Sequence, residues 1–151
     1  MRSTEVAVGR HFVVAFDDGD DFFTALADFC RRHKIRQGMI PGFIAGFREV
    51  DIVGTCDRIE NPDAPIWSKV HLQTVEAHGS GTLAWDETTA TVAPHIHVSV
   101  GLKGQSAIGY TSHLLDAKVQ FLTEMLVVEI AAPHLDRVRD PNLYDAPLMR
   151  F

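Results

Sequence analysis

The chain has 151 residues, of which 46% are hydrophobic and 23% are charged, and its formal net charge is −6. One compact domain is expected at this length, and the apolar fraction excludes a wholly disordered or fibrous protein. No stretch approaches the roughly 18 consecutive apolar residues of a membrane-spanning helix. The acidic balance argues against direct binding to nucleic acid phosphates, because such binding depends on Lys and Arg.

The spacing of the cysteines and the composition of the first residues bear on whether the protein is secreted or stays in the cytoplasm. Cys30 and Cys56 form neither a C-x-x-C motif nor a disulfide framework. The first ten residues lack the apolar region of a secretory signal. We therefore expect a cytoplasmic protein.

The N-terminal part predicts a strand followed by a helix. Residues 10–16 are rich in β-forming side chains and end at an acidic turn, residues 17–20. From Asp20 to about His33 the apolar side chains recur at helical spacing, and a run of cations closes this segment. Cys30 falls on the apolar side of this helix and is expected in the core.

The rest of the chain predicts mainly strands and turns. Residues 38–46 are apolar but hold three glycines and a proline, which favours an irregular or bulged strand over a helix. Strand patterns follow at 49–55, 69–85, 91–102 and 107–110, with a loop at 58–68 and turns at 86–89 and 103–106.

The last third leaves one assignment open. Residues 119–130 are compatible with a helix or a strand, and their β-branched second half favours a strand. Residues 133–151 carry three prolines and little periodicity, which predicts a tail or arm. The elements together predict an α+β fold, a mostly antiparallel β-sheet with one main helix packed on it.

The most informative segment is Pro94-His95-Ile96-His97-Val98-Ser99-Val100. Alternate side chains of a strand share a face, so His95, His97 and Ser99 face away from the apolar core side. Two such histidines lie roughly 6.6–6.8 Å apart at Cα, close enough to converge on one ion. His113 follows the turn at 103–106, and a returning hairpin strand can bring it beside them.

This pattern has two interpretations. Three histidines and one open position are typical of zinc sites that hold a water or a substrate. Alternatively, H-x-H is an exposed strand face whose histidines contact neighbours and solvent. Glu124 lies in an apolar run, where its carboxyl is either a general base with a raised pKa or a paired structural carboxylate. The sequence contains no G-x-S-x-G and no Gly-Lys-Ser/Thr, which argues against a serine hydrolase and a phosphate loop.

The order of these motifs resembles the PPC domain, named for plants and prokaryotes conserved. The resemblance covers about residues 10–130 and includes the Ser80-Gly81-Thr82-Leu83-Ala84 segment, the H-x-H-V-S motif and the later His113-Leu114 pair. In land plants this domain follows AT-hook motifs in nuclear DNA-binding proteins, whereas in bacteria and archaea it usually stands alone. The H-x-H-V-S motif combined with the later His-Leu pair is its most specific part.

The resemblance implies one main helix on an antiparallel sheet, assembled as a homotrimer, with zinc or another divalent transition metal at His95, His97 and His113. The chain departs from the family pattern at Thr111 and Ser112, where Gly-Gly often stands. Residues 1–132 would form the PPC-like domain and residues 133–151 a C-terminal extension. No Arg-Gly-Arg-Pro core of an AT-hook occurs, so reading of the minor groove by inserted arginines has no basis in this chain.

We therefore expect a small cytoplasmic homotrimer that binds a metal, chiefly zinc, and acts as a ligand-binding or protein-interaction module. One alternative is a metal-dependent enzyme in which the ion activates water or polarises a carbonyl, with Glu124 or Tyr110 as the acid or base. The other is a DNA-associated regulator, as in the plant relatives. A small-molecule or protein ligand is expected, direct DNA binding is not, and no membrane is involved.

Overall fold

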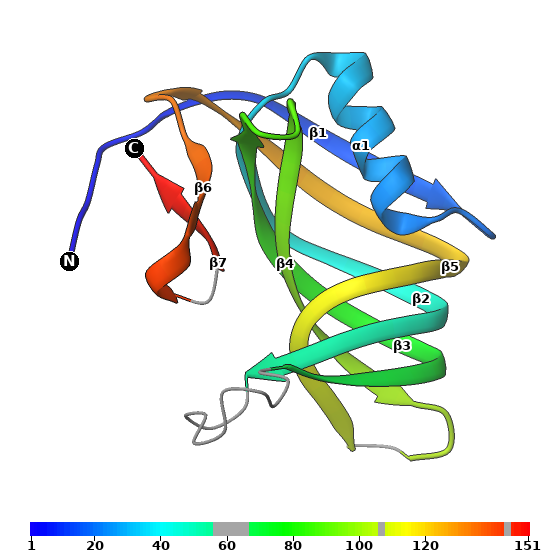
Figure 1. The fold of residues 1–151 in the computed structure, drawn as a ribbon. Helices are drawn as coiled ribbons and strands as arrows, with labels where there is room; N and C mark the ends of the chain where they lie inside the picture. The colour runs from blue at the N-terminus through cyan, green and yellow to red at the C-terminus, as the bar shows by residue number, and fades with distance from the viewer. Residues whose placement is uncertain (56–66, 106–107, 144–145) are drawn as a thin grey trace.

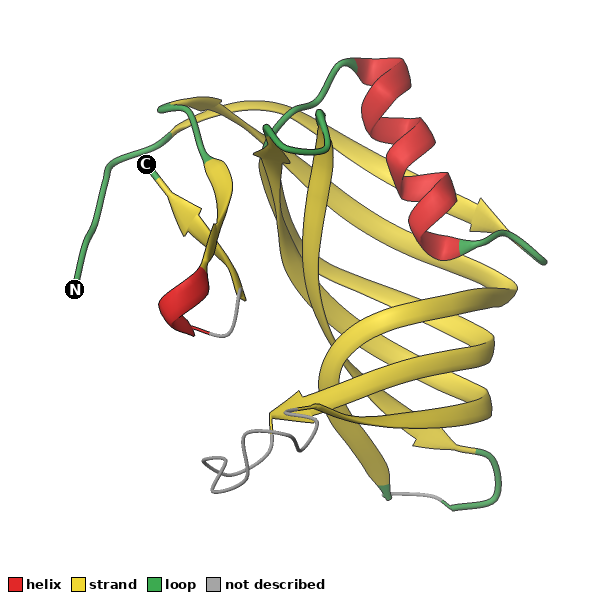
Figure 2. Ribbon diagram, in the orientation of Figure 1, coloured by secondary structure: helices red, strands yellow, loops and turns green. Residues whose placement is uncertain are grey.

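Long antiparallel strands and a single short helix make up the computed structural model, which describes residues 1–55, 67–105, 108–143 and 146–151. The elements are shown in Figures 1 and 2. In chain order they are β1 (Ala7–Asp17), α1 (Phe22–His33), β2 (Gly38–Thr55), β3 (Trp67–Asp86), β4 (Thr91–Leu102), β5 (Gly109–Ala132), β6 (Asp136–Asp140), the 3-10 helix η1 (Pro141–Leu143) and β7 (Ala146–Arg150).

Four of the strands close into a ring. Strand β2 pairs with β3, β3 with β4, β4 with β5, and β5 returns to β2, always antiparallel. Strand β1 extends the sheet by pairing with the second part of β5. The strands therefore form a small closed barrel with one additional strand at its side (Figure 1).

The prediction of a mostly antiparallel sheet with one main helix is confirmed, but the sheet is closed and the fold is mostly β rather than a balanced α+β arrangement. Closure depends on β5, which is 24 residues long. Its first residues pair with β4, while residues from His113 onward pair with β2. The sequence pattern predicts two separate strands at 107–110 and 119–130, because the residues between them do not alternate clearly.

Other sequence expectations concern single elements. Residues 119–130 are strand, as their β-branched half indicates. The bulge expected in residues 38–46 is present, because the pairing of β2 with β3 shifts between Ile40 and Phe43. Pro41 lies within this shift, where its lack of an N–H costs no ladder hydrogen bond. Cys56 and most of the loop predicted at 58–68 lie outside the described residues. The last two residues of that predicted loop, Trp67 and Ser68, belong to β3.

Helix α1 lies beside β1 at one end of the sheet (Figure 1), and its apolar side chains pack into the core. The helix begins at the N-cap Asp21, whose carboxylate accepts the Thr24 N–H at 2.8 Å, and it ends at Lys34 in a left-handed conformation. Its buried side chains are Phe22, Leu26, Phe29 and Cys30, which confirms the expectation that Cys30 is a core residue.

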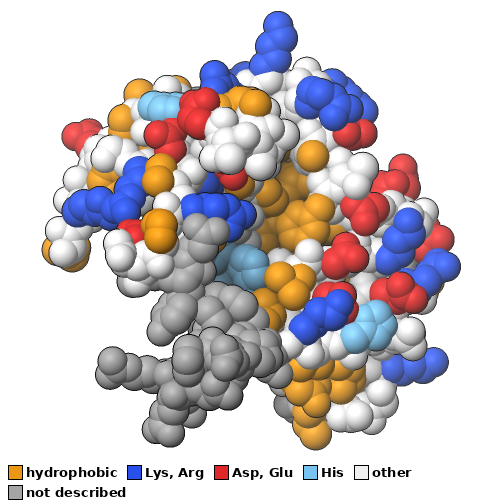
Figure 3. Space-filling model, in the orientation of Figure 1, with side chains coloured by type: hydrophobic (Ala, Val, Ile, Leu, Met, Phe, Trp, Pro, Cys, Tyr) orange, Lys and Arg blue, Asp and Glu red, His pale blue; other side chains and the backbone are white. Residues whose placement is uncertain are grey.

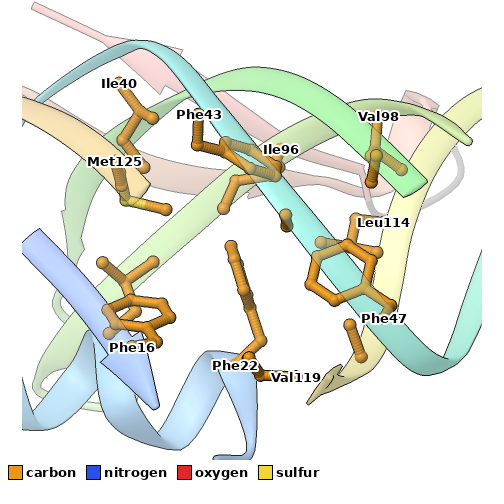
Figure 4. Close-up of a cluster of buried hydrophobic side chains, with 14 of the residues drawn as sticks. Phe16, Phe22, Ile40, Phe43, Phe47, Ile96, Val98, Leu114, Val119 and Met125 are labelled. Carbon is orange, nitrogen blue, oxygen red and sulfur yellow. The ribbon is translucent and has the colours of Figure 1, made fainter. Parts of the chain in front are cut away.

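Phe22 connects the helix to the strands. Its ring centroid lies 5.4 Å from those of Phe16 and Phe43 and 5.7 Å from that of Phe47. Figure 4 shows it between these rings, with Ile96 and Val98 of β4 on the far side of the same core. Burial of one such side chain contributes about 1.5–3 kcal/mol, so the helix is held mainly through this apolar face.

The C-terminal segment contains two short strands. Strands β6 and β7 pair as an antiparallel hairpin, and β6 joins the sheet through a parallel pairing of Asp136 with Trp85 of β3. Local periodicity is weak here because each strand has only five residues. Among the described residues, no helix has the length and apolar character needed to cross a membrane.

Candidate metal centre

Strand β4 presents its histidines on the outer side of the ring. Ile96, Val98 and Val100 are buried in the core, whereas His97 and Ser99 between them are exposed. The alternation expected from the sequence is therefore present. His95 follows the same side of the strand as His97.

His113 joins them from β5. It lies directly opposite His97 in the pairing of β4 with β5, and residues opposite each other in a ladder project to the same side. The next pair along, Ser99 and Thr111, also faces outward, and the two hydroxyl oxygens are 2.9 Å apart. The hairpin return expected from the turn at 103–106 thus brings the third histidine beside the first two.

The three imidazoles converge. The Nε2 atoms of His95 and His97 are 3.2 Å apart, and the three ring centroids lie 5.0–5.5 Å from one another. One ring nitrogen from each histidine lies within 4.8 Å of the others. A tetrahedral zinc ion with bonds of about 2.0–2.1 Å separates its nitrogen ligands by about 3.3 Å, so this donor set fits such an ion after small ring rotations.

The surroundings favour the neutral form of two of these rings, His95 and His113. Burial, followed by the charges of Arg137, His113 and His97, lowers the pKa of His95 to about 4. The pKa of His113 is also lowered, first by burial and then by His97 and Arg137. Neutral imidazole is the form that coordinates a metal, so the pair offers lone pairs rather than protons at neutral pH.

Thr111 and Ser112, the departures from the family pattern, have defined partners. Thr111 contacts Ser99 as described above, and the Ser112 hydroxyl donates to the carbonyl of Val53 on β2. The two side chains point to opposite sides of β5, so neither stands between His113 and His97. The bulkier residues are thus accommodated within the sheet.

One residue near this centre carries no signal in the sequence. Arg137 of β6 is buried, with 7% of its surface exposed, and it donates a hydrogen bond to the Thr82 hydroxyl. Thr82 lies directly opposite His95 on the neighbouring strand. No local pattern distinguishes Arg137 from Arg139 two residues later, because only the folding of the C-terminal hairpin onto β3 places it here. Figure 3 shows histidine surface opening into a hollow between that hairpin and the strands.

The two acid/base candidates lie elsewhere. Glu124 is exposed rather than buried. It pairs with Ile44 of β2, Ile44 pairs with His78 of β3, and His78 pairs with Ser99 of β4. Strands β2 and β3 therefore lie between Glu124 and β4. Tyr110 is three residues before His113 on β5, which places it on the opposite side of that strand. The structure brings neither side chain to the three histidines.

Two further groups contain histidine. His71 is half exposed, and its Nδ1 lies 2.7 Å from the carboxylate of Asp51, as suits a surface residue. Glu87, His134 and Asp136 form a second cluster with ligand atoms within 4.8 Å, but Asp136 already contacts His134, and Glu87 lies 3.7 Å from Arg36. These carboxylates and this histidine already have partners.

The closed mostly-β fold and the three outward histidines define a small domain with a site able to hold a transition metal. The model of the Plants and Prokaryotes Conserved (PCC) domain, also written PPC, matches residues 3–131. The chain belongs to this family, which confirms the resemblance drawn from its motifs. No curated protein matches the chain at a significant level.

Solved structures share the fold. The metal-containing protein AF0104 from Archaeoglobus fulgidus is 24% identical, with a TM-score of 0.82 and complete coverage of both chains. A PPC protein from Pyrococcus horikoshii is 20% identical, with a TM-score of 0.82, covering 100% of this chain and 98% of that one. An acetolactate decarboxylase from Bacillus subtilis is 13% identical, with a TM-score of 0.57, covering 95% of this chain and 62% of that one. At these identities the likeness concerns the fold alone.

Proposed function

We propose that this protein is a metal-binding PPC module in which His95, His97 and His113 hold one divalent transition ion and leave a position open for a small ligand. The observation that carries the proposal is the convergence of three imidazoles on one side of the strand pair β4 and β5. The fold it shares with a protein described as metal-containing supports the same reading. Imidazole suits zinc, copper, nickel and iron alike, and the choice of zinc rests on the family resemblance.

The proposal includes assembly of the chain with itself as a homotrimer in the cytoplasm. Support comes from the outer side of β1, β2 and β5, where large apolar side chains are exposed: Val13, Ile44, Phe121, Leu122 and Leu126. Val13 pairs with Leu126, and Ile44 pairs with Glu124 two residues earlier, so Val13, Ile44 and Leu126 lie close together, with the exposed Glu124 among them. Contiguous apolar surface of this kind is typical of subunit interfaces. The number of three subunits comes from the resemblance.

Enzymatic use of the ion is the alternative. When bound, the ion would supply a polarised water or carbonyl, but Glu124 and Tyr110 are not at the histidines to move a proton. A regulator that binds DNA directly is disfavoured by the net charge of −6. A ligand-binding or interaction module therefore has the stronger support.

The test is the metal content of protein purified without chelators or a histidine tag. We expect one ion per chain in the wild type, almost none in the triple variant His95→Ala, His97→Ala, His113→Ala, and little in His97→Ala alone. Circular dichroism should be unchanged in His97→Ala, because Ile96, Val98 and Val100 still fill the core side of β4. The matched control replaces His71 and His78, exposed histidines of β3, and should keep its ion. A metal-free wild type, or a triple variant that keeps its metal, contradicts the proposal.

A further inference from the structure

Arg137 is a buried cation without a counter-charge among the described residues. Its guanidinium makes one hydrogen bond, to the neutral hydroxyl of Thr82, and its Nε has no hydrogen-bond partner within the described part of the chain. No carboxylate of those residues forms an ion pair with it. Burial of a guanidinium that lacks an anionic partner is costly, and arginine cannot relieve the cost by losing its proton.

The same guanidinium lies beside the proposed metal centre. Its partner Thr82 is opposite His95, and its charge acts on both His95 and His113. A fixed positive charge next to a cation site repels the metal ion unless an anion lies between them. Arg137 and a metal ion held by the histidines would therefore form a pair of positive charges that an anion could join.

The fold holds Arg137 rigidly in this place. Gln37 is buried and fixes the start of the C-terminal segment, because its side chain donates to the carbonyls of Ile130 and Pro133 and accepts the Leu135 N–H at 2.7 Å. Two residues later Arg137 pairs with Met149 of β7. A guanidinium whose backbone and neighbours are already fixed loses little conformational freedom when it binds a ligand.

We propose that Arg137 and the cluster of His95, His97 and His113 form a single binding site for a small carboxylate. The guanidinium would donate to the carboxylate, and the same group would fill the open position of the metal. A carboxylate is favoured over phosphate, because one planar guanidinium fork matches its two oxygens and no second cation joins Arg137 among the described contacts. Arg137 lies outside the residues 3–131 that match the family model, so this specificity would belong to the C-terminal hairpin. The inference rests on the proposed metal centre.

The experiment first loads the purified protein with zinc and measures its metal content, then titrates it with acetate by calorimetry. We expect acetate to bind the zinc-loaded wild type and to bind Arg137→Met roughly 10- to 100-fold more weakly, as for the loss of charge-assisted hydrogen bonds. The zinc content of Arg137→Met should equal or exceed that of the wild type, because a repulsive charge is gone. Arg139→Met, an exposed arginine of the same strand, is the matched control and should bind acetate normally.

The outcomes separate the two proposals. A wild type that takes up no zinc overturns the metal centre, whereas zinc uptake with equal acetate affinity in wild type and Arg137→Met overturns the carboxylate site alone. Phosphate that binds more tightly than acetate, with the same dependence on Arg137, overturns the assignment to carboxylates. If Arg137→Met does not fold, Arg137→Lys replaces it, since loss of the fork should still weaken acetate. A further test requires no variant: the melting temperature of the zinc-loaded wild type is measured in acetate and in chloride at equal ionic strength. Equal melting temperatures in the two salts count against the site.

Discussion

Gly79 of β3 lies so close to β4 that a Cβ atom on this residue would stand 2.7 Å from the carbonyl oxygen of His97. The same atom would overlap the ring of Phe43 in the core. A Cβ atom on Gly81, two residues along, would stand even closer to the carbonyl oxygen of His95. The missing side chains thus set how near β3 comes to the two residues that carry the first two imidazoles.

Replacing Gly79 with Ala should therefore disturb the fold and the metal centre together. Overpacking typically costs about 1–3 kcal/mol, and displacement of β4 would move His97 relative to His113. We expect a lower melting temperature and weaker zinc affinity, measured by thermal unfolding and by competition with a chromophoric chelator. Gly101→Ala on β4 is the control, because its added Cβ meets nothing nearer than 3.9 Å. Equal stability and affinity in Gly79→Ala and wild type would refute this role.

These glycines also show what the sequence reveals and what it does not. Gly79-Ser80-Gly81 is compatible with a bend, yet the pairing of β3 with β4 continues unbroken through these residues, and only the pairing with β2 shifts there. A glycine needed for close approach is indistinguishable in sequence from one needed for a turn, because the reason lies in another strand. By contrast, the outward side of His95 and His97 follows from alternation alone, which is a local property of the strand.

The contribution of β6 could not be predicted for a related reason. The position of His113 beside His97 depends on a short hairpin, so the spacing indicates it. Arg137 reaches the same centre only because a hairpin beyond β5 folds back onto β3, a contact between residues 55 positions apart. Both interpretations of Glu124 assume a buried carboxyl because the run is apolar, but in β5 Glu124 shares the outer side with the exposed Leu122 and Leu126, whereas Met125 beside it is buried.

The start of α1 gives a prediction on stability. Asp21 accepts the N–H of Thr24 at 2.8 Å as the N-cap, and this bond lowers the pKa of Asp21. Asp21→Ala should destabilise the protein by about 1 kcal/mol, the usual cost of losing such a cap. Chemical denaturation measures the difference. Asp28→Ala on the exposed side of the same helix is the control and should have a smaller effect, because Asp28 only pairs with Arg31 at the surface. Equal losses in both variants would argue against capping as the cause.

The ion pair between Arg10 and Glu129 gives a pH dependence. Arg10 binds both carboxylate oxygens of Glu129 at 2.7 Å, and these hydrogen bonds lower the pKa of Glu129 in the folded state. A depressed folded-state pKa contributes stability that is present above the unfolded value, near 4.5, and is lost as the pH falls through the folded value.

Glu129→Gln should therefore melt below the wild type at pH 7, and the gap should close as the pH drops well under 4.5. Thermal unfolding at pH 7, 5 and 3 measures this gap. Glu49→Gln is the control, since Glu49 is exposed and forms no ion pair among the described residues, and it should show no such trend. A difference in melting temperature that stays constant from pH 7 to pH 3 would mean that the stabilisation by the Arg10 contact does not depend on the charge of Glu129.

The apolar outer patch gives the last prediction. Ile44 on β2 is 56% exposed, and burial of this outer surface between subunits would remove its side chain from water. We expect a solution mass of three times the 16.7 kDa of one chain, measured by sedimentation equilibrium at micromolar concentration. Ile44→Glu should shift the mass toward that of one chain, because a buried and unpaired carboxylate opposes association. Val138→Glu, an exposed position on β6 outside the patch, should leave the mass unchanged. A wild type that sediments as a single chain would rule out the trimer.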